Sequence, residues 1–195
     1  MSKIDDLNDF QPLSRQEWRD WLTENHAEPQ GIWLVYFKKS SGKPRVNYDE
    51  AVEEALCFGW IDSLPRKIDD ERAKLLFTPR KPKSVWSQLN KTRIERLIER
   101  GLMTEIGFAK IAAAKKDGSW NALDASDNLE IAEDLANAFD ENHEARKNFD
   151  AFSNSVKKAI LQWLNSSKQT ETRKKRIVKL VAMAANNKRV NFDKE

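Results

Sequence analysis

The stretch Gly31-Ile-Trp-Leu-Val-Tyr-Phe-Lys38 decides the fold of the first half of the chain. Its apolar residues are all branched or aromatic, and turn-forming residues flank them on both sides. This composition is typical of a β-strand buried on both faces. We therefore expect a strand at 31–38, followed by an exit loop at 40–44.

Helical patterns lie on either side of this strand. Ser14, followed three residues later by Glu17, forms a capping-box pattern and predicts a helix that runs to about Asn25. After the strand, apolar residues recur at helical spacing from Asp49 to Phe58, and a glycine follows. We expect a second helix over that range.

The next segment predicts a β-hairpin. Two strand-like runs, Trp60–Ile68 and Lys74–Arg80, are joined by the charged turn 69–72. Pro65 lies inside the first run, which predicts an edge strand or a bulged strand. Because side chains alternate along a strand, we expect Trp60, Asp62 and Arg66 to point to one face.

From Pro82 onward the sequence predicts only helices. Ser84 is the expected cap of a long helix that ends at Gly101. Further helices are expected at 106–116, 129–140, 143–152, 156–164 and 172–185. The predicted fold class is α+β: a small, mostly antiparallel sheet with packed helices, followed by an all-helical C-terminal module. We assign residues 1–128 to the α+β domain and 129–195 to the helical module.

The composition indicates a highly charged protein that does not insert into a membrane. Charged residues make up 33% of the 195, and the mean hydropathy is −0.75. Apolar runs such as 32–37 are far too short to cross a bilayer. The first ten residues contain three Asp and no apolar core, unlike a secretory signal. We therefore expect a cytoplasmic location.

The reactive residue types are scarce. One Cys and two His exclude a disulfide framework and a metal site built from several such ligands. Cys57 lies among apolar residues and is expected to be buried, while Glu53 and Glu54 are most simply surface charges. No glycine-rich phosphate loop is present. We predict no catalytic residue, no metal and no cofactor.

Charge is unevenly distributed along the chain. Residues 117–145 contain nine acidic residues and no Lys or Arg, whereas 151–195 contain 11 Lys/Arg and 3 Asp/Glu. The abrupt change indicates a boundary between two units near Asn128.

The densest polar motif is FTPRKPKSVWSQLNK at 77–91, which combines four Lys/Arg, two Pro and one Trp. It resembles a stiff basic loop that leads into a helix N-terminus, where unpaired backbone N–H groups favour an anion. The alternative is a purely structural corner, in which Ser84 only caps the helix, Asn90 bonds to a loop carbonyl, and Arg80, Lys81 and Lys83 are solvated. The predicted ligand-binding residues are Trp60, Asp62, Arg66, Arg80, Lys81, Ser84, Trp86, Ser87 and Asn90.

A second dense motif, WLNSSKQTETRKKRI, occupies 163–177. It places Arg173 and Arg176 near the start of a helix opened by Thr170 or Thr172, where positive charge opposes the helix dipole. A specific partner would explain these arginines: either the protein's own acidic segment or nucleic acid bound weakly and without sequence preference. The residues predicted for the nucleic-acid alternative are Lys168, Arg173, Lys174 and Arg176.

Four motifs together resemble the YdeI/OmpD-associated family, also called bacteriocin-protection proteins. They are LCFGWIDSLPRKID at 56–69, the basic motif at 77–91, AKKDGSW at 114–120, and the motif at 163–177. The resemblance covers 14–189 and implies a bacterial cytosolic protein with a sheet-containing N-terminal part and a helical C-terminal module. It brings no catalytic residues, cofactor or substrate with it.

The leading hypothesis is therefore a non-enzymatic protein that binds a small anionic ligand or a peptide. The alternative is a nucleic-acid-binding protein that uses its basic C-terminal helices. A third hypothesis is an enzyme whose mechanism leaves no sequence motif.

Overall fold

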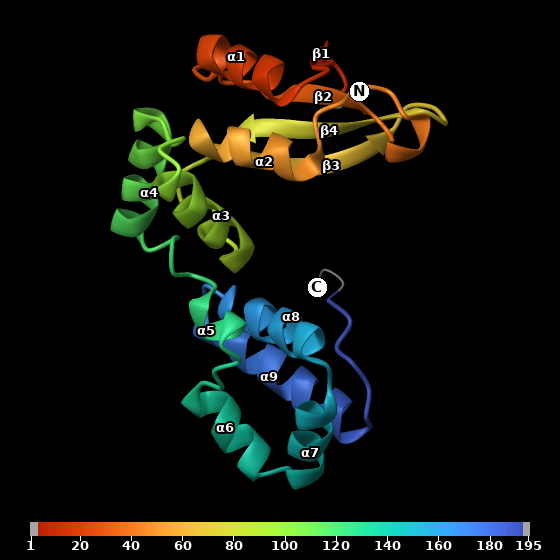
Figure 1. Ribbon diagram of the computed structural model, residues 1–195. Helices are drawn as coiled ribbons and strands as arrows, with labels where there is room; N and C mark the ends of the chain where they lie inside the picture. Colours follow the sequence, from red (N-terminus) through yellow and green to blue (C-terminus); the bar gives the residue numbers. More distant parts are fainter. Residues whose placement is uncertain (1–3, 193–195) are drawn as a thin grey trace. The chain divides into compact units, whose positions relative to one another are not determined.

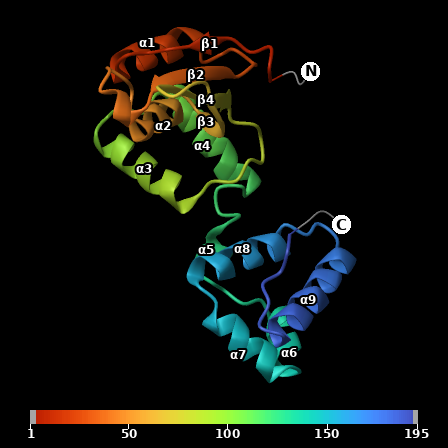
Figure 2. The same ribbon diagram turned by 90° about the vertical axis from the view of Figure 1, so that its right-hand side faces the viewer.

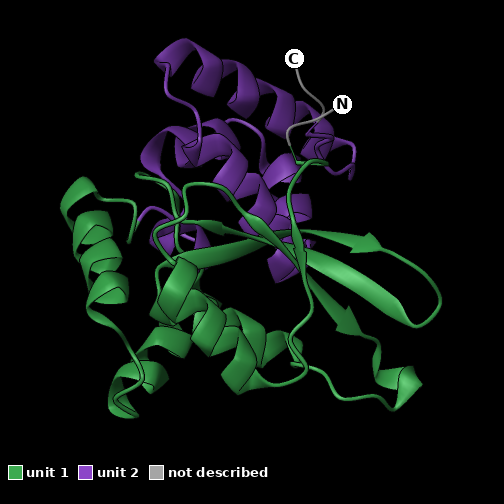
Figure 3. Cartoon of the chain, turned by 90° about the horizontal axis from the view of Figure 1, so that it is seen from above, with its two compact units in different colours: residues 1–121 green, residues 122–195 purple. Residues whose placement is uncertain are grey.

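A computed structural model describes residues 4–192 of the chain. The chain forms two compact units, residues 1–121 and 122–195, which are coloured separately in Figure 3. The units divide after Asn121, a few residues before the predicted division after Asn128. Across the described part of the chain, no helix combines the length and apolar character needed to span a membrane.

Unit 1 is built on a four-stranded sheet, which confirms the α+β class (Figure 1). Its strands are β1 (Asp9–Phe10), β2 (Ile32–Phe37), β3 (Trp60–Lys67) and β4 (Arg72–Pro79), in the order β1-β2-β4-β3. Only β1 is parallel to its neighbour. The predicted central strand and the hairpin are confirmed, whereas the short β1 was not predicted.

A bulge in β3 sets which residues share a face. Asp62 pairs with Phe77, but after a register shift between Asp62 and Pro65, Arg66 pairs with Lys74. Phe77 and Lys74 point to opposite faces because side chains alternate along β4. The expectation that Asp62 and Arg66 lie on one face is therefore wrong, although the bulged edge strand predicted from Pro65 is confirmed.

Two helices pack over one face of the sheet, α1 (Arg15–Asn25) and α2 (Tyr48–Cys57). Ser14 caps α1 by accepting the backbone N–H of Glu17, as predicted. Trp18 of α1 is fully buried, and its indole N–H donates to the carbonyl of Ala51 at 3.0 Å. Between β2 and α2 the chain makes one short 3₁₀ turn, Lys39–Ser41.

The remaining helices of unit 1 are α3 (Gln88–Glu99) and α4 (Glu105–Asp117). The predicted start of α3 at Ser84 is wrong: Ser87 is the N-cap, and its hydroxyl accepts the backbone N–H of Asn90. The preceding residues 80–86 form an irregular turn because two prolines lie within 79–82 and Lys83 adopts a left-handed backbone conformation. α4 is capped by Thr104.

Unit 2 contains only helices among its described residues (Figure 2). They are α5 (Asp124–Asp127), α6 (Glu133–Asp140), α7 (His143–Ala151), α8 (Asn154–Asn165) and α9 (Thr170–Ala185). The helix predicted at 129–140 begins only at Glu133, because Leu129 has φ +59° and cannot lie in a right-handed helix. Ile160, Leu164, Leu180 and Phe149 are in the core of this unit.

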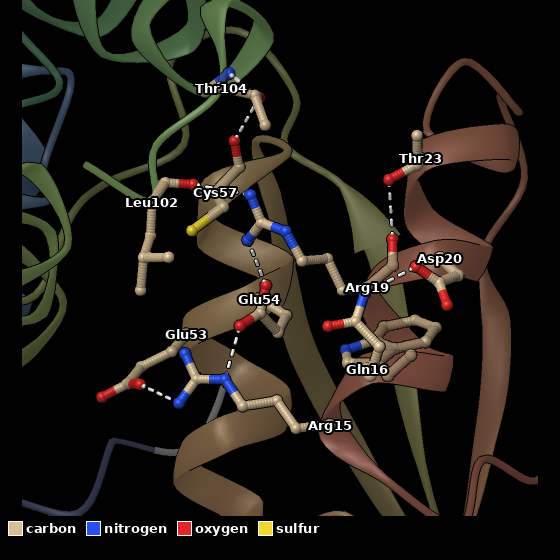
Figure 4. A network of polar contacts seen from close by, with 12 residues as sticks. Arg15, Gln16, Arg19, Asp20, Thr23, Glu53, Glu54, Cys57, Leu102 and Thr104 are labelled. Carbon is tan, nitrogen blue, oxygen red and sulfur yellow. Dashed lines mark hydrogen bonds and ion pairs between the residues drawn. The ribbon is translucent and has the colours of Figure 1, made fainter. Parts of the chain in front are cut away.

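A buried carboxylate joins α1 to α2 (Figure 4). The Glu54 residue is 1% exposed, and its two oxygens accept from Arg15 Nε and Arg19 Nη1, each at 2.5 Å. Arg15 also pairs with Glu53, at 2.9 Å. The interpretation of Glu54 as a surface charge is wrong: a charge this deep is retained because two guanidinium groups compensate it.

Cys57 lies in the same region and is buried, as predicted. Burial raises the pKa of its thiol to about 11. The thiol is therefore protonated at neutral pH and is a poor nucleophile.

Candidate anion-binding site

The site centres on Arg80, the first residue after β4. Its backbone N–H donates to the carbonyl of Gly59 at 2.9 Å, and its own carbonyl accepts from Lys110 Nζ at 3.3 Å. Gly59 has φ +71°, and a Cβ there would overlap the side chain of Lys110. The sheet edge and α4 thus fix the backbone from which the Arg80 side chain extends.

The Arg80 side chain is buried, and no carboxylate among residues 4–192 pairs with it. The residue is 5% exposed, and its guanidinium carbon lies 3.5 Å from the centre of the Trp86 ring. Nη1 donates to the Val85 carbonyl at 3.2 Å and, more weakly, to Ser84 Oγ at 3.4 Å. Nε is buried and has no hydrogen-bond partner. Burial lowers the pKa of Arg80 to about 10, because the charged form has lost its water.

A small cavity of about 80 Å³ opens beside this guanidinium. The turn after β4 forms one wall, and the C-terminal half of α4 with the residues after it forms the other. The lining residues are Arg80, Lys81, Pro82, Lys83, Ser84, Trp86, Lys110, Ala113, Ala114, Asp117 and Ser119.

Unsatisfied polar atoms converge on this cavity. Within residues 4–192, three buried side-chain N or O atoms lack a hydrogen-bond partner: Arg15 Nη2, Arg80 Nε and Ser119 Oγ. The last two line the same cavity. Buried polar groups are nearly always satisfied in proteins, so the unpaired Arg80 Nε, in a residue that lines this cavity, indicates a place for an acceptor from a ligand or ordered water.

Asp117 fixes the rim of the cavity. Its carboxylate accepts the backbone N–H of Lys83 at 3.0 Å and that of Ser119 at 2.9 Å. The nearby Ser119 side chain, with these contacts, lowers the pKa of Asp117, so the carboxylate is charged at neutral pH. Lys83 has φ +62°, a conformation that a non-glycine residue rarely adopts and that directs its N–H toward Asp117. The turn is thereby tied to the end of α4.

Two indoles support the guanidinium from behind. Trp86 is buried, and its ring centre lies 5.1 Å from that of Trp120. Arginine stacks well on such a face because its charge is delocalised over a flat group. The Arg80 side chain is consequently held in one position before any ligand arrives.

The structure brings together four of the nine predicted ligand-binding residues, namely Arg80, Lys81, Ser84 and Trp86. The other five lie elsewhere. Trp60 is buried and donates its indole N–H to the His26 carbonyl at 3.0 Å. Asp62 accepts the Tyr48 hydroxyl at 2.9 Å, and its charge reaches Arg80 only through space.

Arg66 is on the opposite face of the sheet, over the Trp33 ring, and pairs with Asp5 at 2.6 Å. Ser87 caps α3. Asn90 does not bond to a loop carbonyl, as the structural alternative supposed, but accepts from Arg93 Nη1 at 2.9 Å.

Sequence reasoning missed the wall contributed by Lys110, Ala113, Asp117 and Ser119. These residues lie about 30 positions from Arg80, and no local pattern connects them with it. The only available signal was the family-like motif AKKDGSW at 114–120, which contains Asp117 and Ser119. Across residues 4–192, no group of three or more His, Cys, Asp or Glu is placed to hold a metal ion.

The basic residues of the second predicted site make contacts inside unit 2. Arg173 donates to both oxygens of Asp134, at 2.5 and 2.9 Å, which lowers the pKa of Asp134. Arg176 donates to the Trp163 carbonyl and lies 4.9 Å over the Trp163 ring. Both arginines therefore hold α9 to neighbouring segments.

The other predicted nucleic-acid contacts, Lys168 and Lys174, are exposed, and nucleic-acid binding stays a prediction. Neither Thr170 nor Thr172 caps α9; Gln169 occupies the N-cap position without a side-chain hydrogen bond.

Comparisons with known proteins give two family matches. Residues 10–110, just over half of the chain, match the family described as "Domain of unknown function (DUF8412)". Residues 128–187 match the family described as "Bacteriocin-protection, YdeI or OmpD-Associated". The predicted resemblance is confirmed for the helical C-terminal part. Neither curated proteins nor solved structures give a significant match.

Proposed function

The chain belongs to the DUF8412 family and carries a YdeI/OmpD-associated region at 128–187, and on the evidence of the cavity at Arg80 we propose that it is a non-enzymatic protein that binds a small anion. The observation that carries the proposal is the buried Arg80 Nε, which lacks an acceptor. The family descriptions name no ligand, so the proposal rests on the site alone.

Electrostatics supports an anion. A buried, uncompensated charge is costly, and the penalty falls when an opposite charge with hydrogen-bonding capacity enters. Three lysines, Lys81, Lys83 and Lys110, line the cavity together with Arg80, against a single carboxylate from Asp117. The lining therefore carries a net positive charge.

The lining also supports binding over catalysis. It contains neither Cys nor His, and the oxygens of its one carboxylate, Asp117, accept two backbone N–H groups. Of its hydroxyls, Ser84 contacts Arg80, and Ser119 interacts with the Asp117 carboxylate, which already accepts two backbone N–H groups. Neither hydroxyl has a histidine in the lining to act as its base. What the site offers is a preorganised guanidinium, which favours recognition of an anion.

Thermal unfolding with added anions tests this proposal. Sodium acetate and sodium phosphate are compared with sodium chloride at equal ionic strength. A ligand at ten times its Kd stabilises the folded state by about 1.4 kcal/mol. For a chain of this size, that raises the Tm by about 3–6 °C. We expect such a rise for at least one of the two anions.

Two matched variants give the controls. Arg80→Met removes the charge and fills a similar volume, so the protein should remain folded but lose the anion-dependent rise in Tm. Arg100→Met removes an exposed charge from the C-terminal end of α3, and this variant should retain the anion-dependent rise in Tm. Equal shifts in wild type and Arg80→Met would show a general salt effect and would contradict the proposal.

A further inference from the structure

We propose that the anion is a short aliphatic monocarboxylate, a class that includes free acids of two to four carbons and the C-terminal carboxylate of a peptide ending in a small residue. This inference rests on the proposed function, because it names the ligand class of the same cavity. Three features of the cavity support this inference: the hydrogen-bond donors of Arg80, the negative charge of Asp117 and the apolar wall.

The free donors match a carboxylate. Nη1 of Arg80 is engaged by Ser84 and Val85, and Nε, which shares the other edge of the guanidinium with Nη2, has no acceptor among residues 4–192. That edge presents two parallel N–H groups, the arrangement that binds both oxygens of a carboxylate. The Ser119 hydroxyl, which interacts with Asp117 in the structure, supplies a third hydrogen bond when it turns toward one of the same oxygens. The two carboxylate oxygens then accept the hydrogen bonds that Arg80 and Ser119 offer.

The negative charge of Asp117 disfavours a dianionic ligand. Asp117 faces the same cavity and is ionised at neutral pH, as described above. Inorganic phosphate carries between one and two negative charges near neutral pH and sulfate carries two, whereas a carboxylate carries one, so Asp117 repels phosphate and sulfate more strongly. No ion pair joins Asp117 to Arg80 within the described chain, so Arg80 is not neutralised by it.

The apolar wall and the small volume of the cavity limit the polarity and size of the part of the ligand beyond its carboxylate. Trp86, Pro82, Ala113 and Ala114 offer apolar surface beside the donors. An alkyl group can lie on this surface, whereas the remaining oxygens of phosphate or sulfate would lose hydrogen bonds there. A cavity of about 80 Å³ holds about five water molecules. The cavity itself therefore holds only a few heavy atoms of a ligand.

Ligand titrations followed by two-dimensional ¹⁵N NMR of the full chain test the inference. The probes are acetate, propionate, butyrate, phosphate and sulfate, each at constant ionic strength. We expect acetate, propionate and butyrate to bind at least tenfold more tightly than phosphate or sulfate. A short peptide ending in alanine, with and without C-terminal amidation, distinguishes a peptide from a free acid as the source of the carboxylate.

Three further variants locate the binding. Ala113→Leu should fill the cavity and abolish binding, whereas Ala112→Leu changes a neighbouring exposed residue of α4 that does not line it. Ser119→Ala should weaken carboxylate binding about tenfold, as expected for a hydrogen bond to a charged group. These substitutions leave Arg80 and its stacking on Trp86 unchanged, so they remain informative if an Arg80 variant fails to fold.

The outcomes separate the two proposals. Phosphate or sulfate binding that requires Arg80, without carboxylate binding, would overturn the monocarboxylate inference and leave the anion site intact. Carboxylate binding that survives Ala113→Leu would also overturn it. If no anion binds in an Arg80-dependent way, both proposals fail.

Discussion

Replacing Glu54 with glutamine should destabilise unit 1 far more than any surface charge change. The side chain of Glu54 is 2% exposed and pairs with Arg15 and Arg19, whose side chains are 27% and 26% exposed. Removing one partner of a buried ion pair typically costs about 3–5 kcal/mol, because the remaining charge is left uncompensated. Both arginines keep some contact with water, so we expect the lower end of that range, about 3 kcal/mol.

Urea unfolding followed by tryptophan fluorescence measures this effect. Six of the seven tryptophans lie in unit 1, so the signal reports mainly on the unit that contains Glu54. The matched control is Glu53→Gln, which removes the neighbouring carboxylate that makes one partly exposed contact with Arg15. We expect this control to cost less than about 1 kcal/mol. Surface substitutions typically scatter by about 0.5 kcal/mol. If the free energies of unfolding of the two variants differ by less than that, the pairing of Glu54 with Arg15 and Arg19 does not stabilise unit 1.

Three further predictions concern other side chains. Because burial raises the pKa of Cys57 to about 11, an aromatic disulfide reagent at pH 8 should label native protein only as fast as unit 1 opens, and immediate labelling would contradict this. Arg173 lowers the pKa of Asp134 in the folded state, so their pairing stabilises unit 2 above the ordinary pKa of about 4 and is lost as pH falls through the lower folded pKa. Asp134→Asn should therefore reduce the difference between the free energies of unfolding at pH 7 and pH 3, measured by urea unfolding. The reduction should be less than about 1 kcal/mol because the pair is partly exposed. Trp163 is only half-buried against the core of unit 2, so Trp163→Ala should cost less than the about 3–5 kcal/mol of a fully buried tryptophan, and a larger loss in a calorimetric scan would show that it anchors the core.

The elements that could be predicted from the sequence are those fixed by local chemistry. The strand at 31–38 is recognisable because a continuous branched and aromatic run can be buried on both faces. The helix after Ser14 is recognisable because its cap and Glu17 are three residues apart. Pro65 marked the edge strand for a similar reason, since proline cannot complete a central ladder.

What could not be predicted depends on residues far apart in the chain. The predicted face of Arg66 was wrong because one register shift moves every side chain beyond it to the opposite face of the sheet. The alternation of residue types in the sequence does not reveal this shift. Glu54 looked exposed because its partners, Arg15 and Arg19, lie 39 and 35 residues earlier. The wall formed by Asp117 and Ser119 was missed because only the folded unit places it beside Arg80.

The most direct test of the anion site is the NMR signal of the Arg80 side-chain Nε–H. This group is buried without a partner, so its resonance should be visible and should lie outside the range of solvated arginines. We expect acetate to shift the resonance in a saturable titration, as Nε gains an acceptor, and Ala113→Leu to abolish the shift. An Nε–H resonance that acetate and phosphate leave unchanged, in a protein otherwise folded, would show that no anion binds at Arg80.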